Sequence, residues 1–373
     1  MDPRTAKLAD VLVNYSTAVK PGEKVFIKGG IKTEPLILAL YKKVLQAGGH
    51  PLVWVTLAGT DELRYRYASD EQLGTFPDPL KLVTETYDVM ISLWGSENKN
   101  MLTGVDPEKI ARVKTAGKDD FLKYAERAAR GELRWVGAPF PTQADAQEAD
   151  MGLLDYEDFV YSACLPDMED PVGYWRNFFS WQQKIVDWFK GKGKVQVIAP
   201  GTNLQFSIQD RIFINCAGLE NLPDGEIYTG PVKESLEGNV SFSFPTCYHD
   251  REVTGVRLWF EKGRVVKASA DKGEHYLLHM LETDEGASYV GEFAIGTNPN
   301  ITRITKNTLF DEKIGGAFQL ALGASFPETG GFNESAIHWD MVSDLREGGE
   351  IWVDGELIHK DGAFTLDFSS QPL

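Results

Sequence analysis

The hydrophobic positions in the first half of the chain switch between two spacings. Five of them recur at the intervals of an amphipathic helix that Gly22 ends: Leu8, Val11, Leu12, Tyr15 and Val19. A second helix is expected to begin at Thr33-Glu34-Pro35, where a proline and an acid suit the first turn, and to end at Gly48-Gly49. Short apolar runs predict strands at residues 24–28, 52–56, 89–94 and 133–137. Strands separated by helices favour a mainly parallel sheet, so we expect an α/β N-terminal domain.

An aromatic segment, residues 171–189, separates the two halves of the chain. Its large apolar residues fall near one stripe of a helix, which predicts a packing surface in preference to a cofactor site: Trp175, Phe178, Trp181, Ile185 and Trp188. The flexible, charged stretch at residues 191–194 follows and predicts the domain boundary. We therefore expect an α/β domain at residues 1–190 and a second domain at residues 191–373.

The second half has the pattern of a β-rich α+β domain. Short runs between turn sequences predict strands at residues 195–199, 203–208, 239–244, 253–260 and 264–270. One helix is expected near residues 274–282, and it carries His275 and His279 on one face. A zinc-protease helix needs glutamate directly after the first histidine, and Tyr276 stands there. We expect this histidine pair to pack or to face solvent.

Composition narrows the class of protein without identifying it. The 373 residues are 42% hydrophobic and 25% charged, close to globular averages. With 38 basic and 55 acidic residues the net charge is −17, and so anionic a surface repels phosphate backbones and anionic lipid. The first residues enter an amphipathic pattern without the apolar core of a signal peptide, no apolar run reaches the roughly 18 residues that a membrane helix needs, and the three cysteines are widely spaced. We expect a cytoplasmic protein that binds neither nucleic acid nor membranes.

Glycine-rich nucleotide loops and the Gly-x-Ser-x-Gly motif are missing, which weakens the case for nucleotide and serine-hydrolase chemistry. The remaining candidate functional groups are carboxylates and one imidazole in the second half of the chain. Glu226 follows Pro-Asp-Gly and begins a predicted strand, although strands tend to deplete glutamate. Glu292 stands in an otherwise apolar strand, where a buried carboxylate is costly unless it is paired or binds a cation. His338 and Asp340 are two apart, so on a strand both point to one face.

Two interpretations of these four residues stay open on spacing alone. In the first, they converge on a divalent cation of the zinc or cobalt class, for which imidazole and carboxylate are suitable ligands. In the second, Glu226 and Glu292 lie at strand edges in solvent, and His338 forms a structural hydrogen bond with Asp340. The fold must decide between them, because the residues are far apart in the sequence.

Five segments of the second half resemble, in their order and spacing, the thermophilic metallo-aminopeptidase (aminopeptidase T-like) family, and the resemblance covers essentially the whole chain. They read Asn-Leu-Pro-Asp-Gly-Glu-Ile-Tyr-Thr-Gly-Pro, Gly-Glu-Phe-Ala-Ile-Gly-Thr-Asn, Asn-Thr-Leu-Phe-Asp-Glu-Lys-Ile-Gly-Gly, Pro-Glu-Thr-Gly-Gly and His-Trp-Asp-Met-Val. The resemblance implies a two-domain homodimer with an enclosed cavity that removes single N-terminal residues from peptides. It also implies a pair of divalent metals held by two glutamates, two histidines and an aspartate, with a tyrosine nearby.

Carried over position by position, the resemblance assigns four metal ligands: Glu226, Glu292, His338 and Asp340. Glu292 is also expected to bridge the metals and to act in catalysis. Two positions depart from the family, which has histidine where this chain has Gln319 and tyrosine where it has Phe326. Glutamine is a weak substitute for imidazole at zinc, and phenylalanine lacks a hydroxyl whose loss typically slows turnover ~10²–10³-fold. We expect one metal to bind poorly and the chemistry to be slowed.

The expected function is therefore a metal-dependent aminopeptidase that uses metal-activated water and one or two divalent ions per chain, zinc, cobalt or manganese. The alternative is a degenerate, metal-deficient member of the family that acts as a peptide-binding or structural dimer. Gln319 and Phe326 are the features that favour this alternative.

Overall fold

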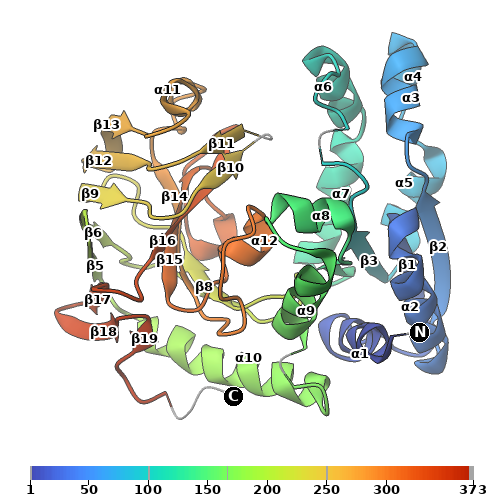
Figure 1. The fold of residues 1–373 in the computed structure, drawn as a ribbon, viewed down its shortest axis with the longest axis horizontal. Coiled ribbons are helices and arrows are strands. Elements are labelled where there is room, and N and C mark those ends of the chain that lie inside the picture. Colours follow the sequence, from blue (N-terminus) through green and yellow to red (C-terminus); the bar gives the residue numbers. More distant parts are fainter. Residues whose placement is uncertain (1, 100, 166, 249–250, 369–373) are drawn as a thin grey trace. The chain divides into compact units, whose positions relative to one another are not determined.

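The computed structural model describes residues 2–99, 101–165, 167–248 and 251–368, and the chain divides into two compact units (Figure 1). The first unit consists of Met1–Trp175 with Gly218–Pro223, and the second of Arg176–Ala217 with Asp224–Leu373. The division falls within helix α10 (Pro171–Phe189). The boundary expected from the sequence, at residues 191–194, lies just beyond the end of this helix.

The first unit is built on a four-stranded sheet in the order β2-β1-β3-β4, in which neighbouring strands run parallel. Its strands are β1 (Lys24–Gly30), β2 (His50–Thr56), β3 (Val89–Trp94) and β4 (Arg134–Pro139). The helices are α1 (Pro3–Val11), α2 (Glu34–Gln46), α3 (Thr60–Tyr67), α4 (Asp70–Leu73), α5 (Asp78–Thr86), α6 (Pro107–Ala116), α7 (Lys118–Ala129), α8 (Gln143–Glu148) and α9 (Leu153–Cys164). A π-helical turn at Leu12–Ser16 continues α1, and a 3₁₀ turn at Ile31–Thr33 precedes α2. The prediction of an α/β domain with a parallel sheet is confirmed.

The second unit is β-rich, as predicted, and contains antiparallel sheets. An eight-stranded sheet has the order β13-β12-β9-β6-β5-β17-β18-β19, a five-stranded sheet the order β16-β15-β14-β8-β7, and β10 pairs with β11. Its strands are β5 (Lys194–Ala199), β6 (Thr202–Ser207), β7 (Ile214–Cys216), β8 (Glu226–Thr229), β9 (Glu237–Ser241), β10 (Thr246–Tyr248), β11 (Arg251–Val253), β12 (Arg257–Glu261), β13 (Arg264–Ser269), β14 (Val290–Gly296), β15 (Ala317–Gly323), β16 (His338–Asp344), β17 (Glu350–Val353), β18 (Glu356–Lys360) and β19 (Ala363–Phe364). Besides the greater part of α10, this unit contains α11 (Glu274–Leu281), α12 (Thr308–Asp311) and a 3₁₀ turn at Pro327–Thr329.

One strand of the second unit was predicted wrongly. The single strand expected at residues 253–260 is divided, because β11 ends at Val253 and β12 begins at Arg257. Between them Gly255 has a φ of +64°, in the left-handed region that turns the chain and favours glycine. Val253 and Leu258 are both fully buried, so the apolar pattern continues across the break and concealed it.

The five-stranded sheet has one apolar face that packs inside the second unit. Its residues on β14, β15 and β16 are almost completely buried: Phe293, Ile295, Phe318, Leu320, Leu322, Trp339 and Met341. Phe293 meets Phe206 of β6 edge to face, with ring centroids 4.9 Å apart, so this face packs against the eight-stranded sheet. The opposite face of the five-stranded sheet therefore remains for other groups.

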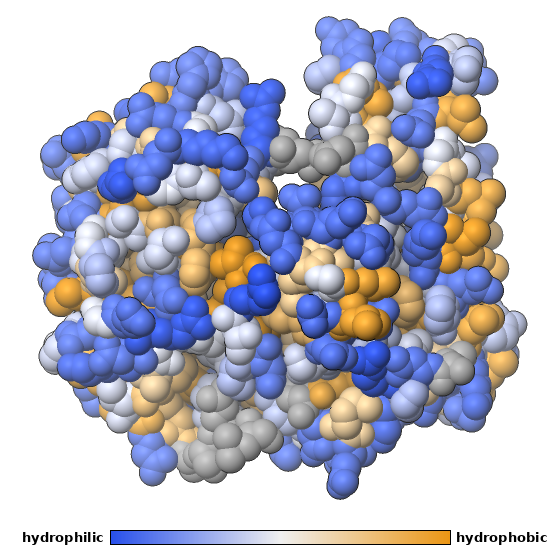
Figure 2. All heavy atoms as spheres, viewed as in Figure 1, coloured by the Kyte–Doolittle hydropathy of each residue, from blue (hydrophilic) through white to orange (hydrophobic). Residues whose placement is uncertain are grey.

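The exposed surface agrees with the composition. Hydrophilic residues cover most of the face shown in Figure 2, as expected for a net charge of −17. His275 and His279 are exposed on α11. Within the described ranges, no helix combines the length and the apolar character that crossing a membrane requires.

Candidate metal centre

Three neighbouring strands bring an imidazole and two carboxylates onto one face of the five-stranded sheet. β14, β15 and β16 pair antiparallel, so that Glu292 lies opposite Ala321, and Ala321 lies opposite Asp340. Gly323, two residues further along β15, lies opposite His338. Residues that lie directly opposite one another share a face, and the alanine and the glycine leave space between the larger polar side chains.

Glu226 joins this face from the next strand, β8, where it lies opposite Gly296 of β14. Glu226 is 7% exposed and Glu292 is 4% exposed. The interpretation in which these two carboxylates lie at strand edges in solvent is therefore wrong. The structure brings together the four residues that the sequence singled out, and their role as metal ligands stays a prediction.

His338 is held in an orientation that suits a ligand. Its Nδ1–H donates to the carbonyl oxygen of Ala324 at 2.9 Å. Its Nε2 lies 3.6 Å from Oε2 of Glu292 and 3.4 Å from Oδ1 of Asp340. Burial alone would lower the pKa of His338, but Asp340 and Glu292 beside it raise that pKa to about 10. A histidine whose Nδ1–H is bound to a carbonyl presents Nε2 as the metal-binding atom.

Gln319, at the position where the sequence departs from the family, lies between two carboxylates. Its Nε2 donates to Oε1 of Glu292 at 2.8 Å and to Oε2 of Glu226 at 3.2 Å. Burial, with Asp340 nearby, raises the pKa of Glu292 to about 8. Burial also raises the pKa of Glu226 well above its ordinary value. In this arrangement the side chain of Gln319 is a hydrogen-bond donor to the candidate ligands.

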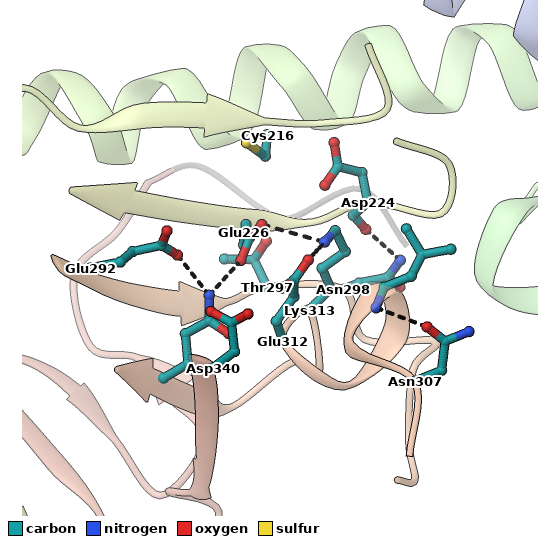
Figure 3. Close-up of polar contacts among 12 residues, drawn as sticks. Cys216, Asp224, Glu226, Glu292, Thr297, Asn298, Asn307, Glu312, Lys313 and Asp340 are labelled. Carbon is teal, nitrogen blue, oxygen red and sulfur yellow. Dashed lines mark hydrogen bonds and ion pairs between the residues drawn. The ribbon is translucent and has the colours of Figure 1, made fainter. Parts of the chain in front are cut away.

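Glu312 and Lys313, to which the sequence analysis gave no role, complete the cluster. Lys313 is fully buried, and its Nζ lies 3.3 Å from Oε1 of Glu226 and forms a second ion pair with Glu312 (Figure 3). Burial alone would lower the pKa of Lys313, but Glu226 and Glu312 hold it well above its ordinary value. A signal was present in the sequence, because the charged triplet at residues 311–313 interrupts a segment that is otherwise apolar or glycine.

The backbone fixes Lys313 in this place. The carbonyl oxygen of Lys313 accepts a hydrogen bond from the backbone N–H of Asn298 at 3.1 Å, and the N–H of Gly315 donates to the carbonyl of Asn298 at 2.9 Å. The segment passes so close to β14 that a Cβ added at Gly296 would lie 2.2 Å from the carbonyl oxygen of Ile314. Glycine at position 296 is thus required for the close approach that carries Lys313 to Glu226.

Gln182 of α10 supports the strand that carries Glu226. The amide nitrogen of Gln182 lies 2.8 Å from the carbonyl oxygen of Glu226 and 2.9 Å from that of Cys216. Its Oε1 accepts a hydrogen bond from Oγ1 of Thr297 at 2.5 Å. One fully buried amide therefore connects β7, β8 and the end of β14.

A second group of potential ligands lies beside the first. Cys216 of β7 is opposite Glu226, and Asp224 precedes β8 by two residues. One ligand atom from each of Cys216, Asp224 and Glu226 lies within 4.8 Å of the others. The spacing of the cysteines along the chain excluded a cysteine-rich zinc site but gave no indication of this mixed cluster.

Phe326 lies against His338, and a tyrosine lies against Phe326. The ring centroid of Phe326 is 4.9 Å from that of His338 and 5.5 Å from that of Tyr228. Tyr228 follows Glu226 by two residues in β8, so both point to the same face, and its hydroxyl donates to Glu328 at 3.1 Å. Burial raises the pKa of Tyr228 far above its ordinary value, so the hydroxyl keeps its proton at neutral pH.

Three of these residues form a donor set that suits a divalent ion. Oδ1 of Asp340 is buried and accepts no hydrogen bond from the described residues, although Nε2 of His338 lies 3.4 Å away. Together with Glu292, these two residues form an imidazole–carboxylate donor set that suits zinc, cobalt or manganese. Glu226 differs, because each of its two oxygens already faces a nitrogen of Lys313 or Gln319.

Comparisons with known proteins agree over almost the whole chain. A family model described as thermophilic metalloprotease (M29) matches residues 1–364. Aminopeptidase 2 of Geobacillus stearothermophilus is 26% identical and is matched over 95% of this chain and 94% of its own length. Aminopeptidase T of Thermus thermophilus is 26% identical over 96% of this chain and 95% of its own. Aminopeptidase AmpS of Bacillus subtilis is 27% identical over 97% of this chain and 99% of its own.

Solved structures share the fold at lower identity. Wild-type AmpT from Thermus thermophilus superposes with a TM-score of 0.85 at 22% identity, over 97% of this chain and 99% of that one. A 2,5-dihydroxypyridine dioxygenase from Pseudomonas putida KT2440 superposes with a TM-score of 0.61 at 13% identity, over 98% of each chain. The same arrangement of strands and helices is thus found in proteins with two different named chemistries.

Proposed function

The chain belongs to the thermophilic metalloprotease (M29) family, and from this premise we propose that it is a metal-dependent aminopeptidase that releases single N-terminal residues from peptides. As a family member it is an enzyme that hydrolyses peptide bonds. The observation that carries the proposal is the convergence of Glu292, His338 and Asp340 on one sheet face of the second unit. The fold alone does not decide the chemistry, since folds host many functions, and sequence relatives named aminopeptidases therefore count for more.

The chain's own residues supply orientation and proton transfer. Glu292, His338 and Asp340 would hold a divalent ion, which would polarise the scissile carbonyl and lower the pKa of water towards ~7. Glu292 is the proposed proton acceptor, because Gln319 fixes its Oε1 while its Oε2 faces His338. The Ala324 carbonyl keeps Nε2 of His338 directed towards the two carboxylates.

Tyr228 is the proposed source of the hydroxyl that Phe326 lacks. It lies on the same sheet face as Glu226, its ring packs against Phe326, and its hydroxyl keeps its proton. A hydroxyl donor near the reacting carbonyl stabilises the negative charge that develops there during hydrolysis.

The test begins with the purified protein dialysed against a chelator. Zinc, cobalt or manganese is then added with chromogenic amides of leucine or arginine. We expect turnover that requires metal and that His338→Asn abolishes. The matched variant His279→Asn, on the exposed face of α11, should retain it. Absence of turnover with every metal would contradict the proposal.

A second experiment measures how far the two departures slow the enzyme. Gln319→His with Phe326→Tyr restores the imidazole and the hydroxyl that the family has at these two positions, and a gain in turnover of at least ~10²-fold would show that the native site is impaired. An unchanged rate would show that the native residues, with Tyr228 and Lys313, already support the chemistry in their own way.

Four features of the proposal remain. Peptide substrates and a homodimer come from the family resemblance, zinc or cobalt from the chemistry of the candidate ligands, and a cytoplasmic location from the composition of the sequence. Light scattering after size-exclusion chromatography tests the dimer, and comparison of peptides with and without an acetylated N-terminus tests the requirement for a terminal amine.

A further inference from the structure

Glu226 is already engaged on both of its oxygens by nitrogen atoms of the chain. Oε1 faces the ammonium group of Lys313 at 3.3 Å, and Oε2 accepts a hydrogen bond from the amide of Gln319 at 3.2 Å. Both partners are fixed donors that present hydrogen atoms, and neither can ligate a cation through the atom that faces Glu226. The other three candidate ligands differ from Glu226, because Glu292, His338 and Asp340 face one another.

The ammonium group of Lys313 is part of the folded framework. The Lys313 side chain is fully buried, and its backbone is tied to Asn298 and passes over Gly296, where a Cβ would collide. A second cation next to Glu226 would therefore stand beside a charge of the same sign that cannot move into solvent without rearranging this segment.

The charges around Lys313 explain why a cation is needed there. The ammonium group forms ion pairs with both Glu312 and Glu226, drawn as dashed lines in Figure 3, and Asp224 is buried close to Glu226. Buried carboxylates are stable when they are paired with a cation or hydrogen-bonded. In this part of the centre the chain itself supplies that cation.

We propose that Lys313 takes the place of a second metal ion, its ammonium group permanently paired with Glu226 and Glu312. The chain then binds one divalent ion, through Glu292, His338 and Asp340. This inference rests on the proposed function, and it assigns the loss of the second metal to Lys313 and not to Gln319. Gln319 becomes a donor that joins the two halves of the centre.

The first measurement is the number of ions bound by the full chain. Chelator-treated protein is equilibrated with excess cobalt by dialysis, and cobalt per chain is determined by plasma mass spectrometry. We expect one ion per chain, with the paramagnetic resonance signal of an isolated cobalt ion. Two ions per chain in the native protein would overturn the inference while leaving the aminopeptidase proposal intact. Absence of both bound cobalt and metal-dependent turnover would instead contradict the proposed function.

Variants separate the contributions of Lys313 and Gln319. Gln319→His returns an imidazole but keeps the ammonium group, so we expect it still to bind one ion. Lys313→Ala removes the ammonium group and is expected to bind two, whereas Lys313→Arg keeps the charge and should bind one. Lys360→Met, which removes a surface lysine paired with Glu350, is the matched control and should bind one.

The outcomes decide between the two residues even if Lys313→Ala fails to fold. Two ions bound by Gln319→His would show that Lys313 does not block the second site and would overturn the inference. A thiolate-to-cobalt absorption band in the near ultraviolet would place the ion at Cys216 with Asp224 and Glu226, and would overturn it as well. One ion in both the native chain and Gln319→His, without that band, supports it.

Discussion

Gln319→Leu tests whether the amide of Gln319 stabilises the carboxylates around it when no metal is bound. The native amide donates to Glu292 at 2.8 Å and to Glu226 at 3.2 Å, and both carboxylates are buried. Hydrogen bonds to charged groups contribute about 1.5–3 kcal/mol each, and the longer bond belongs at the low end of that range. Leucine keeps the volume and adds apolar contact, which offsets about 1 kcal/mol. We expect the metal-free variant to lose about 3 kcal/mol of unfolding free energy above about pH 8, where Glu292 is ionised.

The loss of unfolding free energy caused by Gln319→Leu should grow as the pH rises. Burial raises the pKa of Glu292 to about 8, and the bond from Gln319 opposes that rise. When the pKa of a carboxyl is higher in the folded state than in the unfolded state, the unfolding free energy falls as the pH rises from the unfolded pKa to the folded pKa. Without the amide the folded pKa is higher still, so ionisation of Glu292 between about pH 7 and 9 costs the variant more than the native protein.

The assay is urea denaturation in chelator at several pH values, with hydrogen exchange of peptides from β14 and β15 as the local measurement. Gln196→Leu is the matched control, because Gln196 donates to Asn203 on the exposed side of β5 and should change stability by less than about 0.5 kcal/mol. Equal effects of the two substitutions, at every pH, would refute the reasoning.

Three further predictions concern single side chains. Glu292→Gln should lower metal-saturated turnover at least ~10²-fold without loss of circular dichroism, because it removes the proton acceptor, and near-native turnover would exclude that role. Tyr228→Phe should lower kcat ~10²–10³-fold with little change in KM, and an unchanged kcat would show that its hydroxyl does not act on the reacting carbonyl. His359 is buried, which lowers its pKa to about 4, so the stability of the native chain should fall by about 3 kcal/mol as the pH drops from 6.5 to 4. His359→Phe should remove that part of the acid sensitivity in urea denaturation, and identical pH profiles would contradict the assignment.

Local patterns predicted most of the fold because the helices and strands of this chain have short-range signals. Pro35 and Gly48 mark the ends of α2, and β14 shows itself as an apolar run interrupted by Glu292. The break at Gly255 was missed because a left-handed glycine leaves no trace when the apolar pattern continues on both sides of it.

The candidate site was predicted in part, for a different reason. Glu292, His338 and Asp340 stand out because polar side chains there conflict with buried strands. Lys313 conflicts with its surroundings in the same way, but its role depends on the close passage of its segment over Gly296. Such an approach between segments is a property of the tertiary structure, and spacing along the chain does not encode it.

Ala321, which lies between Glu292 and Asp340, has a consequence for how the sequence of such a protein can change during evolution. Both acids and Ala321 are set in a hydrogen-bonded ladder, so the width of the gap is given by the separation of neighbouring strands, about 4.7–4.9 Å each. The connections that border this sheet face, such as residues 324–337, can change in length or sequence without altering that width. Selection for new substrates can therefore act on the loops, while the ladder keeps the spacing between Glu292 and Asp340.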